Sequence, residues 1–191
     1  MTEIINPDFR EVDEPLFRAS ISPTRVRERI IYDPNTGIAI HAAVKVRPER
    51  SRLDNSWNAQ FAGKELKSIN QMGYKVGAID MRIYLVSRLA WAYMTGAWPS
   101  KLIDHIDRNK TNDRWCNLRE ADYSQNAMNK ASKPGLSGVR GVTLRSSGRF
   151  SARIKVRQRE LYLGSFDTLE DAEQAYKEAA ESEFGNFVRK T

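Results

Sequence analysis

The sequence predicts an α+β protein built from two small domains, and three observations lead to this prediction. Short segments with the alternation of strands stand beside segments with the spacing of amphipathic helices. A polar stretch with proline and two glycines, residues 129–138, has the composition of a linker. The length of 191 residues allows one medium domain or two small ones, because domains cluster around ~100 to 150 residues.

The composition indicates a folded chain and excludes several kinds of protein. Hydrophobic residues make up 40% and charged residues 29%, which is enough apolar material for a core. No run approaches the roughly 20 apolar residues of a membrane span, and the first residues lack the layout of a signal peptide. We therefore expect a cytoplasmic protein without a membrane partner. With one cysteine and two histidines, neither an internal disulfide nor a structural zinc site is expected, so oxygen must hold any metal.

Residues 1–28 are predicted to be an N-terminal arm that ends in a short helix. The first part of this arm has no clear periodicity. Ser22 fits an N-cap with Pro23 at the first helical position, and "TRVRERIIY" continues the helix to Tyr32. "DPNTG", residues 33–37, is a turn.

Strands and one helix are expected between the turn and residue 96. "IAIHAAVKV" (38–46) and "YKVGAIDMRIYLV" (74–86) are rich in β-branched and aromatic residues, which favours strands and a hairpin. "SRLAWAYMTG" has helical spacing and ends in Gly96, a suitable C-cap.

The segment "LIDHIDRNKTNDRWCNLREADYSQNAMN" is predicted to form two strands followed by a helix. Polar and apolar residues alternate around Asp104 and His105, as in a strand, and "DRNKTND" forms a loop. Either Asp122 or Ser124 caps the helix, which carries Asn126. Asp104, His105 and Asn126 therefore belong to one ββα unit.

This unit resembles the HNH nucleases, ββα-metal enzymes, in the form common among phage endonucleases. His105 is followed by Asn117 twelve residues later and by Asn126 nine residues further on, Asp104 precedes the histidine, and "NLR" begins at Asn117. The resemblance implies that His105 is the general base and that Asn117 orients the loop. It further implies that Asp104 and Asn126 bind a divalent metal, Mg²⁺ or Mn²⁺.

The resemblance also defines a domain and two further candidates. Residues 29–131 form the expected nuclease domain, with the ββα-metal core at about 101–131 and a linker at 132–137. Arg119 and Lys130 are candidates for phosphate clamps.

The chemistry of phosphodiester hydrolysis supports the proposed roles independently. The reaction requires a deprotonated water and a cation that neutralises the developing charge. Neutral histidine can accept a proton at cellular pH, and carboxylate and amide oxygens are the hard ligands that suit Mg²⁺ or Mn²⁺. A lone histidine is more often structural, and this interpretation is kept for His41, which lacks such neighbours.

Two positions differ from the pattern of related members. Ser87 and Arg88 stand where many carry His-Arg, which puts in doubt a substrate contact from that helix. Asp113 stands where many have Asn and adds negative charge near the proposed metal.

The C-terminal part is predicted to be a three-stranded antiparallel sheet with one helix. From 150 to 157 the apolar residues and the mainly basic residues alternate, so the strand has one apolar and one basic face. Residues 169–183 have an alanine-rich stripe at helical spacing. Residues 131–160 carry eight cations against Glu160, whereas 165–183 carry seven acidic residues against one lysine.

Residues 138–187 resemble the AP2 domain of plant and phage DNA-binding proteins through "GVRGV", "LGSFDT" and "EDAEQAY", and we assign 138–191 to this domain. The resemblance implies that the sheet lies in the major groove of double-stranded DNA. The expected DNA contacts and their phosphate-binding neighbours are Arg140, Arg145, Arg149, Arg153, Lys155, Arg157, Arg159 and Tyr162. The alternative is that the charged face is only solvated.

Together these features predict a metal-dependent HNH DNA endonuclease, nicking or double-strand cleaving, of the phage homing type. Such a protein would act in the host cytoplasm as a monomer or weak dimer without a small-molecule cofactor. One alternative is a non-cleaving DNA-binding regulator with a degenerate nuclease fold. Another is a nuclease that serves DNA packaging or the breakdown of host DNA.

Overall fold

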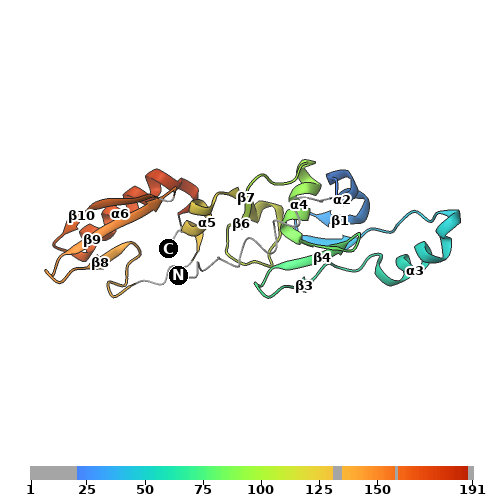
Figure 1. Ribbon diagram of the computed structural model, residues 1–191, viewed down its shortest axis with the longest axis horizontal. Helices are drawn as coiled ribbons and strands as arrows, with labels where there is room; N and C mark the ends of the chain where they lie inside the picture. Colours follow the sequence, from blue (N-terminus) through green and yellow to red (C-terminus); the bar gives the residue numbers. More distant parts are fainter. Residues whose placement is uncertain (1–20, 131–134, 158, 189–191) are drawn as a thin grey trace, which may run out of the picture. The chain divides into compact units, whose positions relative to one another are not determined.

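The computed structural model describes residues 21–130, 135–157 and 159–188 (Figure 1). Several small antiparallel sheets and helices make up a mixed structure, which agrees with the predicted α+β class. Contacts divide the chain into two units, Met1–Arg119 and Glu120–Thr191, which we call the first and second units. Most of the predicted arm and part of the predicted linker lie outside the described residues. None of the helices in the described ranges is long and apolar enough to cross a bilayer.

The first unit has three small antiparallel sheets and three α-helices in its described part. Its elements are α2 (Pro23–Arg29), β1 (Ile30–Asp33), β2 (Ile38–His41), η1 (Pro48–Arg50), α3 (Ser51–Phe61), β3 (Ser68–Ile69), β4 (Lys75–Ile79), β5 (Arg82–Leu85), α4 (Val86–Thr95), β6 (Leu102–His105), η2 (Trp115–Asn117) and β7 (Leu118–Ala121). β1 pairs with β2, β4 lies between β3 and β5, and β6 pairs with β7. The division between the units falls within β7.

The start of α2 is as predicted, but its end is not. The hydroxyl oxygen of Ser22 accepts a hydrogen bond from the Arg25 amide and caps the helix. The prediction that the helix reaches Tyr32 is wrong, because α2 ends at Arg29 and β1 follows at once. The β-branched residues that begin β1 prefer extended backbone and pair with β2 instead.

The predicted β4–β5 hairpin and the predicted helix α4 are both present. Asp80 and Met81 form the hairpin turn with φ of 48° and 65°, the left-handed conformation that such two-residue turns require. Gly96 ends α4 with φ of 75°, as expected for a C-cap. Helix α4 packs on this hairpin and also contacts α2, and the core of the unit includes Val26, Ile30, Ile79, Val86 and Leu89.

The second unit consists of one sheet and two α-helices in its described part. Its elements are α5 (Tyr123–Asn129), β8 (Val142–Leu144), β9 (Phe150–Val156), β10 (Arg159–Phe166), α6 (Leu169–Phe184) and η3 (Gly185–Phe187). The sheet is antiparallel in the order β10-β9-β8, and α6 packs on one face of it (Figure 1). Ala172, Tyr176 and Ala180 form the buried stripe of α6, against Ile154 of the central strand.

Helix α5 contributes to the core of the second unit. Met128 packs in one cluster with Ile154, Tyr176 and Phe184. The backbone amide of Arg157 donates to the Ser124 hydroxyl oxygen, 3.2 Å away, which ties the helix to the end of β9. The contacts therefore group α5 with the sheet, whereas the predicted boundary between the domains lay after residue 131.

Candidate active site

Strand β6 ends in two buried polar residues, Asp104 and His105, which are 5% and 4% exposed. Successive residues of a strand point to opposite faces. In agreement with this, the two side chains have different partners: Arg119 contacts Asp104, and Asp113 contacts His105. A short segment thus presents a carboxylate on one face and an imidazole on the other.

His105 forms a buried hydrogen bond with Asp113. Its Nε2 lies 3.0 Å from Asp113 Oδ1, and Asp113 is only 1% exposed. The ring of Tyr74 lies beside the imidazole, with 5.9 Å between the ring centroids. Lys110 lies 4.6 Å from the centroid of the Tyr74 ring and donates to the Met72 carbonyl. The imidazole therefore has a fixed orientation.

The β1–β2 turn holds the backbone of Asp113 in place. The Tyr32 hydroxyl donates to the Asp113 carbonyl oxygen over 2.6 Å. Gly37 packs so closely that a Cβ there would lie 2.5 Å from the carbonyl carbon of Asp113 and 2.4 Å from the Arg114 nitrogen. With φ of 73° as well, only glycine suits this position. The turn that the sequence predicts thus becomes a support for the partner of His105.

Asn117 fastens the loop that follows β6. Its amide nitrogen Nδ2 donates to the Asn112 carbonyl oxygen at 2.7 Å and to Asp107 Oδ1 at 2.9 Å. Its amide oxygen accepts from the Asp107 backbone amide at 2.9 Å, and its carbonyl accepts from Ile106. Asn117 is 8% exposed, so these bonds satisfy a buried amide. The two ends of the loop are joined through this side chain.

Asp107 is a structural member of the same loop. Its carboxylate accepts from the Asn109 amide, from Asn112 Nδ2 at 2.6 Å and from Asn117 Nδ2. Burial acts to raise the pKa of Asp107, but the hydrogen bonds from Asn112 and Asn117 outweigh it, and the pKa lies below its ordinary value. The carboxylate is therefore held in its ionised form by the loop itself.

Arg119 is paired with Asp104. Its Nε and Nη2 both lie 2.9 Å from Oδ2 of that carboxylate, and its side chain is 16% exposed. Ser87 and Arg88 in the first turn of α4 are also buried, at 3% and 8%. Arg88 donates to the Lys101 carbonyl oxygen over 3.4 Å.

The remaining residues predicted for this site lie on α5, in the second unit. Asn126 is half-buried, Lys130 is exposed, and the helix begins with a capping box in which Asp122 and Gln125 bond to each other's backbone amides. Asp122 is therefore the N-cap, which decides between the two predicted candidates. Asp104, His105, Asn117 and Arg119 belong to the first unit.

The donors proposed for a metal are oxygen atoms. Within residues 21–130, 135–157 and 159–188, no group of three or more His, Cys, Asp or Glu side chains could hold a metal ion. The predicted pair, Asp104 and Asn126, offers a carboxylate and an amide. Such ligands suit a hard divalent cation that keeps several waters, which fits Mg²⁺ or Mn²⁺ and not zinc.

His41 has an aromatic environment that explains it without a catalytic role. Its ring lies 5.6 Å from that of Trp57 and 5.8 Å from that of Phe61. Burial, with a smaller effect of Arg29, lowers the pKa of His41. The structural interpretation of this histidine therefore fits its surroundings.

The strands of the second unit and the loops that connect them expose several cationic side chains. The exposed members are Arg145, Arg149, Arg153, Lys155, Arg157 and Arg159, and Tyr162 is 61% exposed. Two of the arginines have acidic partners: Arg153 lies 2.9 Å from Glu160, and Arg149 lies 2.9 Å from Asp167. Arg153 also lies 5.8 Å from the centre of the Tyr162 ring.

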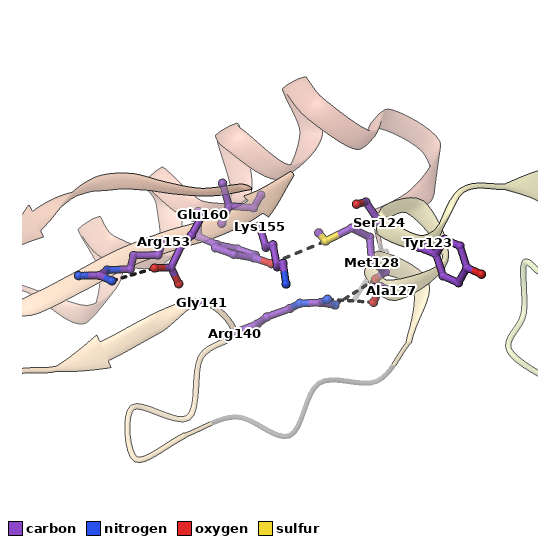
Figure 2. Close-up of a pocket in the computed structure, with 11 residues that line it drawn as sticks. Tyr123, Ser124, Ala127, Met128, Arg140, Gly141, Arg153, Lys155 and Glu160 are labelled. Carbon is purple, nitrogen blue, oxygen red and sulfur yellow. Dashed lines mark hydrogen bonds and ion pairs between the residues drawn. The ribbon is translucent and has the colours of Figure 1, made fainter. Parts of the chain in front are cut away.

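Arg140 differs from the other predicted contacts because its guanidinium points at the end of α5 (Figure 2). It donates to the carbonyl oxygens of Ala127 at 2.9 Å, Met128 at 3.1 Å and Lys130 at 3.3 Å. These carbonyls lie at the C-terminal end of the helix, where the regular helical hydrogen bonds stop, and the Ala127 carbonyl also accepts from the Lys130 backbone amide at 3.3 Å. Beside this contact lies a cavity of about 380 Å³, which Lys155 and Tyr123 also line.

Comparison with known proteins identifies the central segment. Residues 84–128 match the family of HNH endonucleases. The chain is also 30% identical over 123 residues to an uncharacterized HNH endonuclease of Acanthamoeba polyphaga mimivirus, across 64% of this chain and 62% of that protein. The chain thus spans somewhat less than two thirds of the relative's length. In both comparisons the protein that the chain resembles is described as an HNH endonuclease.

The matched segment contains every residue of the predicted catalytic and metal-binding set. His105, Asn117, Asp104 and Asn126 all lie between residues 84 and 128. The resemblance to HNH endonucleases is therefore confirmed for this part of the chain. The likeness to AP2 domains and the homing type stay predictions.

Proposed function

We propose that the chain is a metal-dependent HNH endonuclease that hydrolyses a phosphodiester bond in double-stranded DNA. The observation that carries this proposal is the Asp104–His105 pair at the end of β6, buried within the segment that matches the HNH endonucleases. A histidine that is buried and bonded to a fixed partner is suited to transferring a proton.

In this proposal His105 is the general base. It removes a proton from the attacking water, and the resulting hydroxide attacks the phosphorus. Asn117 keeps the loop after β6 in one conformation, which its three side-chain hydrogen bonds support. A base must lie within hydrogen-bond reach of its water, so a fixed loop favours the reaction.

Asp104 and Asn126 are the proposed metal ligands. Arg119 contacts Oδ2 of Asp104 through Nε and Nη2, which fixes the orientation of the carboxylate. A carboxylate has acceptor sites on each oxygen, and in this proposal Asp104 supplies a carboxylate oxygen to the cation. When bound, Mg²⁺ or Mn²⁺ would neutralise charge on the phosphorane and on the leaving oxygen. Arg119 braces Asp104 in this arrangement, and Lys130 is the proposed phosphate clamp.

The second unit is the proposed reader of the DNA site, in the manner of an AP2 domain. Its support is the group of exposed cations on the strands and connecting loops of a three-stranded sheet, one face of which is covered by the acidic helix α6. The proposed contacts are Arg145, Arg149, Arg153, Lys155, Arg157, Arg159 and Tyr162. Because Arg140 donates to three carbonyl oxygens of α5, we give it a structural part in this unit. The combination of such a reader with a nuclease resembles phage homing endonucleases, and the proposed homing type rests on this resemblance alone.

Cleavage of supercoiled plasmid in the presence of Mg²⁺ tests the proposal. We expect relaxed or linear product from the native protein and none from His105→Ala. His41→Gln, which changes the second of the two histidines, serves as a matched control and should still cleave. If the native protein binds DNA but converts no plasmid, the alternative of a non-cleaving DNA-binding regulator replaces this proposal.

A further inference from the structure

We propose that Asp113 is a positioning residue that fixes His105 in the tautomer with the proton on Nε2, so that Nδ1 is the atom that accepts the proton from water. The inference rests on the proposed function, in which His105 is the general base. It assigns a role to a position that the spacing of the motif does not include. Asp113 lies eight residues after His105, in the loop between β6 and η2.

The tautomer follows from the chemistry of the contact. Asp113 Oδ1 lies 3.0 Å from His105 Nε2, and both side chains are almost completely buried. An ionised carboxylate accepts hydrogen bonds and cannot donate one. The proton in this contact must therefore be carried by Nε2. In a neutral imidazole the other nitrogen, Nδ1, then has the lone pair that can act as a base.

The surroundings of Asp113 indicate that its carboxylate serves the function of the protein and does not increase its stability. Its second oxygen, Oδ2, is buried without a hydrogen-bond partner among the described residues. A buried carboxylate oxygen that lacks a donor opposes folding, and such groups in native proteins call for an explanation. Meanwhile Tyr32 and Gly37 hold the backbone of residue 113 in place. The fold thus maintains a carboxylate at a position where an apolar side chain would be easier to bury.

The carboxylate also stabilises the charge that the reaction creates. When His105 acts, an O–H bond of water breaks, the proton moves to Nδ1 and the water oxygen bonds to phosphorus. The bond from phosphorus to the leaving oxygen then breaks, and solvent supplies the proton for that oxygen. His105 becomes an imidazolium, whose Nε2–H remains bonded to Asp113. An adjacent buried carboxylate favours this charged ring, as in hydrolases with a Ser-His-Asp triad.

The tautomer can be measured directly in the native protein. With nitrogen-15 in the histidine rings, the spectrum contains only His41 and His105, and the variant His105→Ala assigns the two. The spectrum is recorded at alkaline pH, where a further rise in pH no longer changes the chemical shifts of the ring nitrogens. We expect His105 to show a protonated Nε2 and an unprotonated Nδ1. A native protein with the proton on Nδ1 would overturn the proposal, whether or not a variant of Asp113 folds.

Cleavage kinetics test whether Asp113 acts through His105. We expect Asp113→Ala to lower the single-turnover rate at saturating protein by roughly 100-fold or more, within the range of general-base catalysis, with DNA affinity unchanged. Asp113→Asn keeps an oxygen of the same shape as acceptor, so it should retain more of the rate and of the tautomer. The double variant Asp113→Ala with His105→Ala should be no slower than His105→Ala alone.

The outcomes separate this inference from the proposed function. If the native protein binds DNA without cleaving it, the nuclease proposal fails, while the tautomer can still be read from the spectrum. If the native protein cleaves and folded Asp113→Ala cleaves equally fast, the positioning role is wrong. Additive losses in the double variant would also contradict it, because they would mean that Asp113 acts independently of the imidazole.

Discussion

Asp104 and Asp113 are both buried, and each has a basic side chain as its partner. Asp104 is held by the guanidinium of Arg119, and Asp113 by the imidazole of His105. Ionised groups in a protein interior are unfavourable unless they are paired and hydrogen-bonded. The partners are therefore as important to the site as the residues that the motif identifies.

Removing Arg119, the partner of Asp104, tests whether the buried carboxylate depends on a basic side chain. We expect Arg119→Met to lower the free energy of unfolding by about 3–5 kcal/mol, the usual loss when one member of a buried pair is removed. If Asp104 binds a divalent cation, Mg²⁺ should restore part of the loss, because a cation that binds the folded state stabilises it. Urea denaturation of both proteins with Mg²⁺ and with EDTA measures this. If Mg²⁺ stabilises neither protein, the metal-binding role of Asp104 is contradicted.

Asn117 allows a matched pair of substitutions. Asn117→Ala removes all the side-chain bonds that close the loop, and we expect a loss of about 1–3 kcal/mol in stability, as for buried groups left unpaired. Asn117→Asp has the same shape but replaces the donor Nδ2 by an oxygen facing Asp107 Oδ1, where the present distance is 2.9 Å. Because two carboxylates would then meet, the aspartate variant should be no more stable than the alanine variant. Urea denaturation near neutral pH compares them; a fully stable aspartate variant would show that the loop does not depend on this donor.

At the scale of elements, local signals predicted the structure where they agreed with the packing. The cap of α2, the β4–β5 hairpin, the end of α4 and the three-stranded sheet all follow from short-range chemistry. The end of α2 could not be predicted in this way, because the pairing of β1 with β2 outweighs the helical periodicity of the sequence. Ser151 was placed on the exposed basic face but is 3% exposed. It lies on the central strand between Thr143 and Ser165, whose strands flank its short side chain.

The candidate site could be predicted only as far as spacing along the chain determines it. The intervals between His105, Asn117 and Asn126 identify the motif, and the structure places Asn117 where it can brace the loop. Spacing contains no information about which ring nitrogen of His105 is bonded, so the role of Asp113 required coordinates. The contact of Arg140 with α5 could not be predicted either, because the sequence does not distinguish this arginine from the others of the basic segment.

Asp80 links two elements and should make their association sensitive to pH. In the β4–β5 turn it accepts hydrogen bonds from Arg25 of α2, at 2.8 and 3.1 Å, and these bonds lower the pKa of Asp80 despite the opposing effect of burial. A carboxyl whose folded pKa is depressed stabilises the protein above its unfolded pKa of about 3.9, and the contribution is lost as pH falls through the folded pKa.

We therefore expect Asp80→Asn to be less stable than the native protein at neutral pH, by less than ~1 kcal/mol because the Arg25 side chain is 42% exposed. The difference should disappear in acid, as Asp80 of the native protein becomes protonated. Urea denaturation at a series of pH values measures it. A difference that stays constant from neutral to acidic pH would mean that the charge of Asp80 contributes nothing.

At the scale of the whole molecule, the second unit separates its charges by sign, with cations on the sheet and its loops and acidic residues on α6. If this sheet engages about six phosphates, the logarithm of the binding constant should fall with the logarithm of salt concentration at a slope near −5. Each phosphate contact that is removed should reduce the steepness by about 0.9. Salt dependence can therefore distinguish a cation that contacts DNA from one that only supports the fold.

Lys155 and Arg140 form a matched pair for this test, because both line the same cavity of the second unit (Figure 2). Lys155 is exposed on β9, so Lys155→Ala should weaken DNA binding and make the slope about 0.9 less steep. Arg140 already donates to three carbonyl oxygens at the end of α5, so Arg140→Ala should lower thermal stability and leave the slope unchanged. Titrations of labelled duplex at several salt concentrations, with melting curves of each protein, provide both quantities. Equal slopes for native protein and Lys155→Ala would mean that Lys155 does not contact DNA phosphates. A flatter slope for Arg140→Ala would mean that Arg140 does contact them.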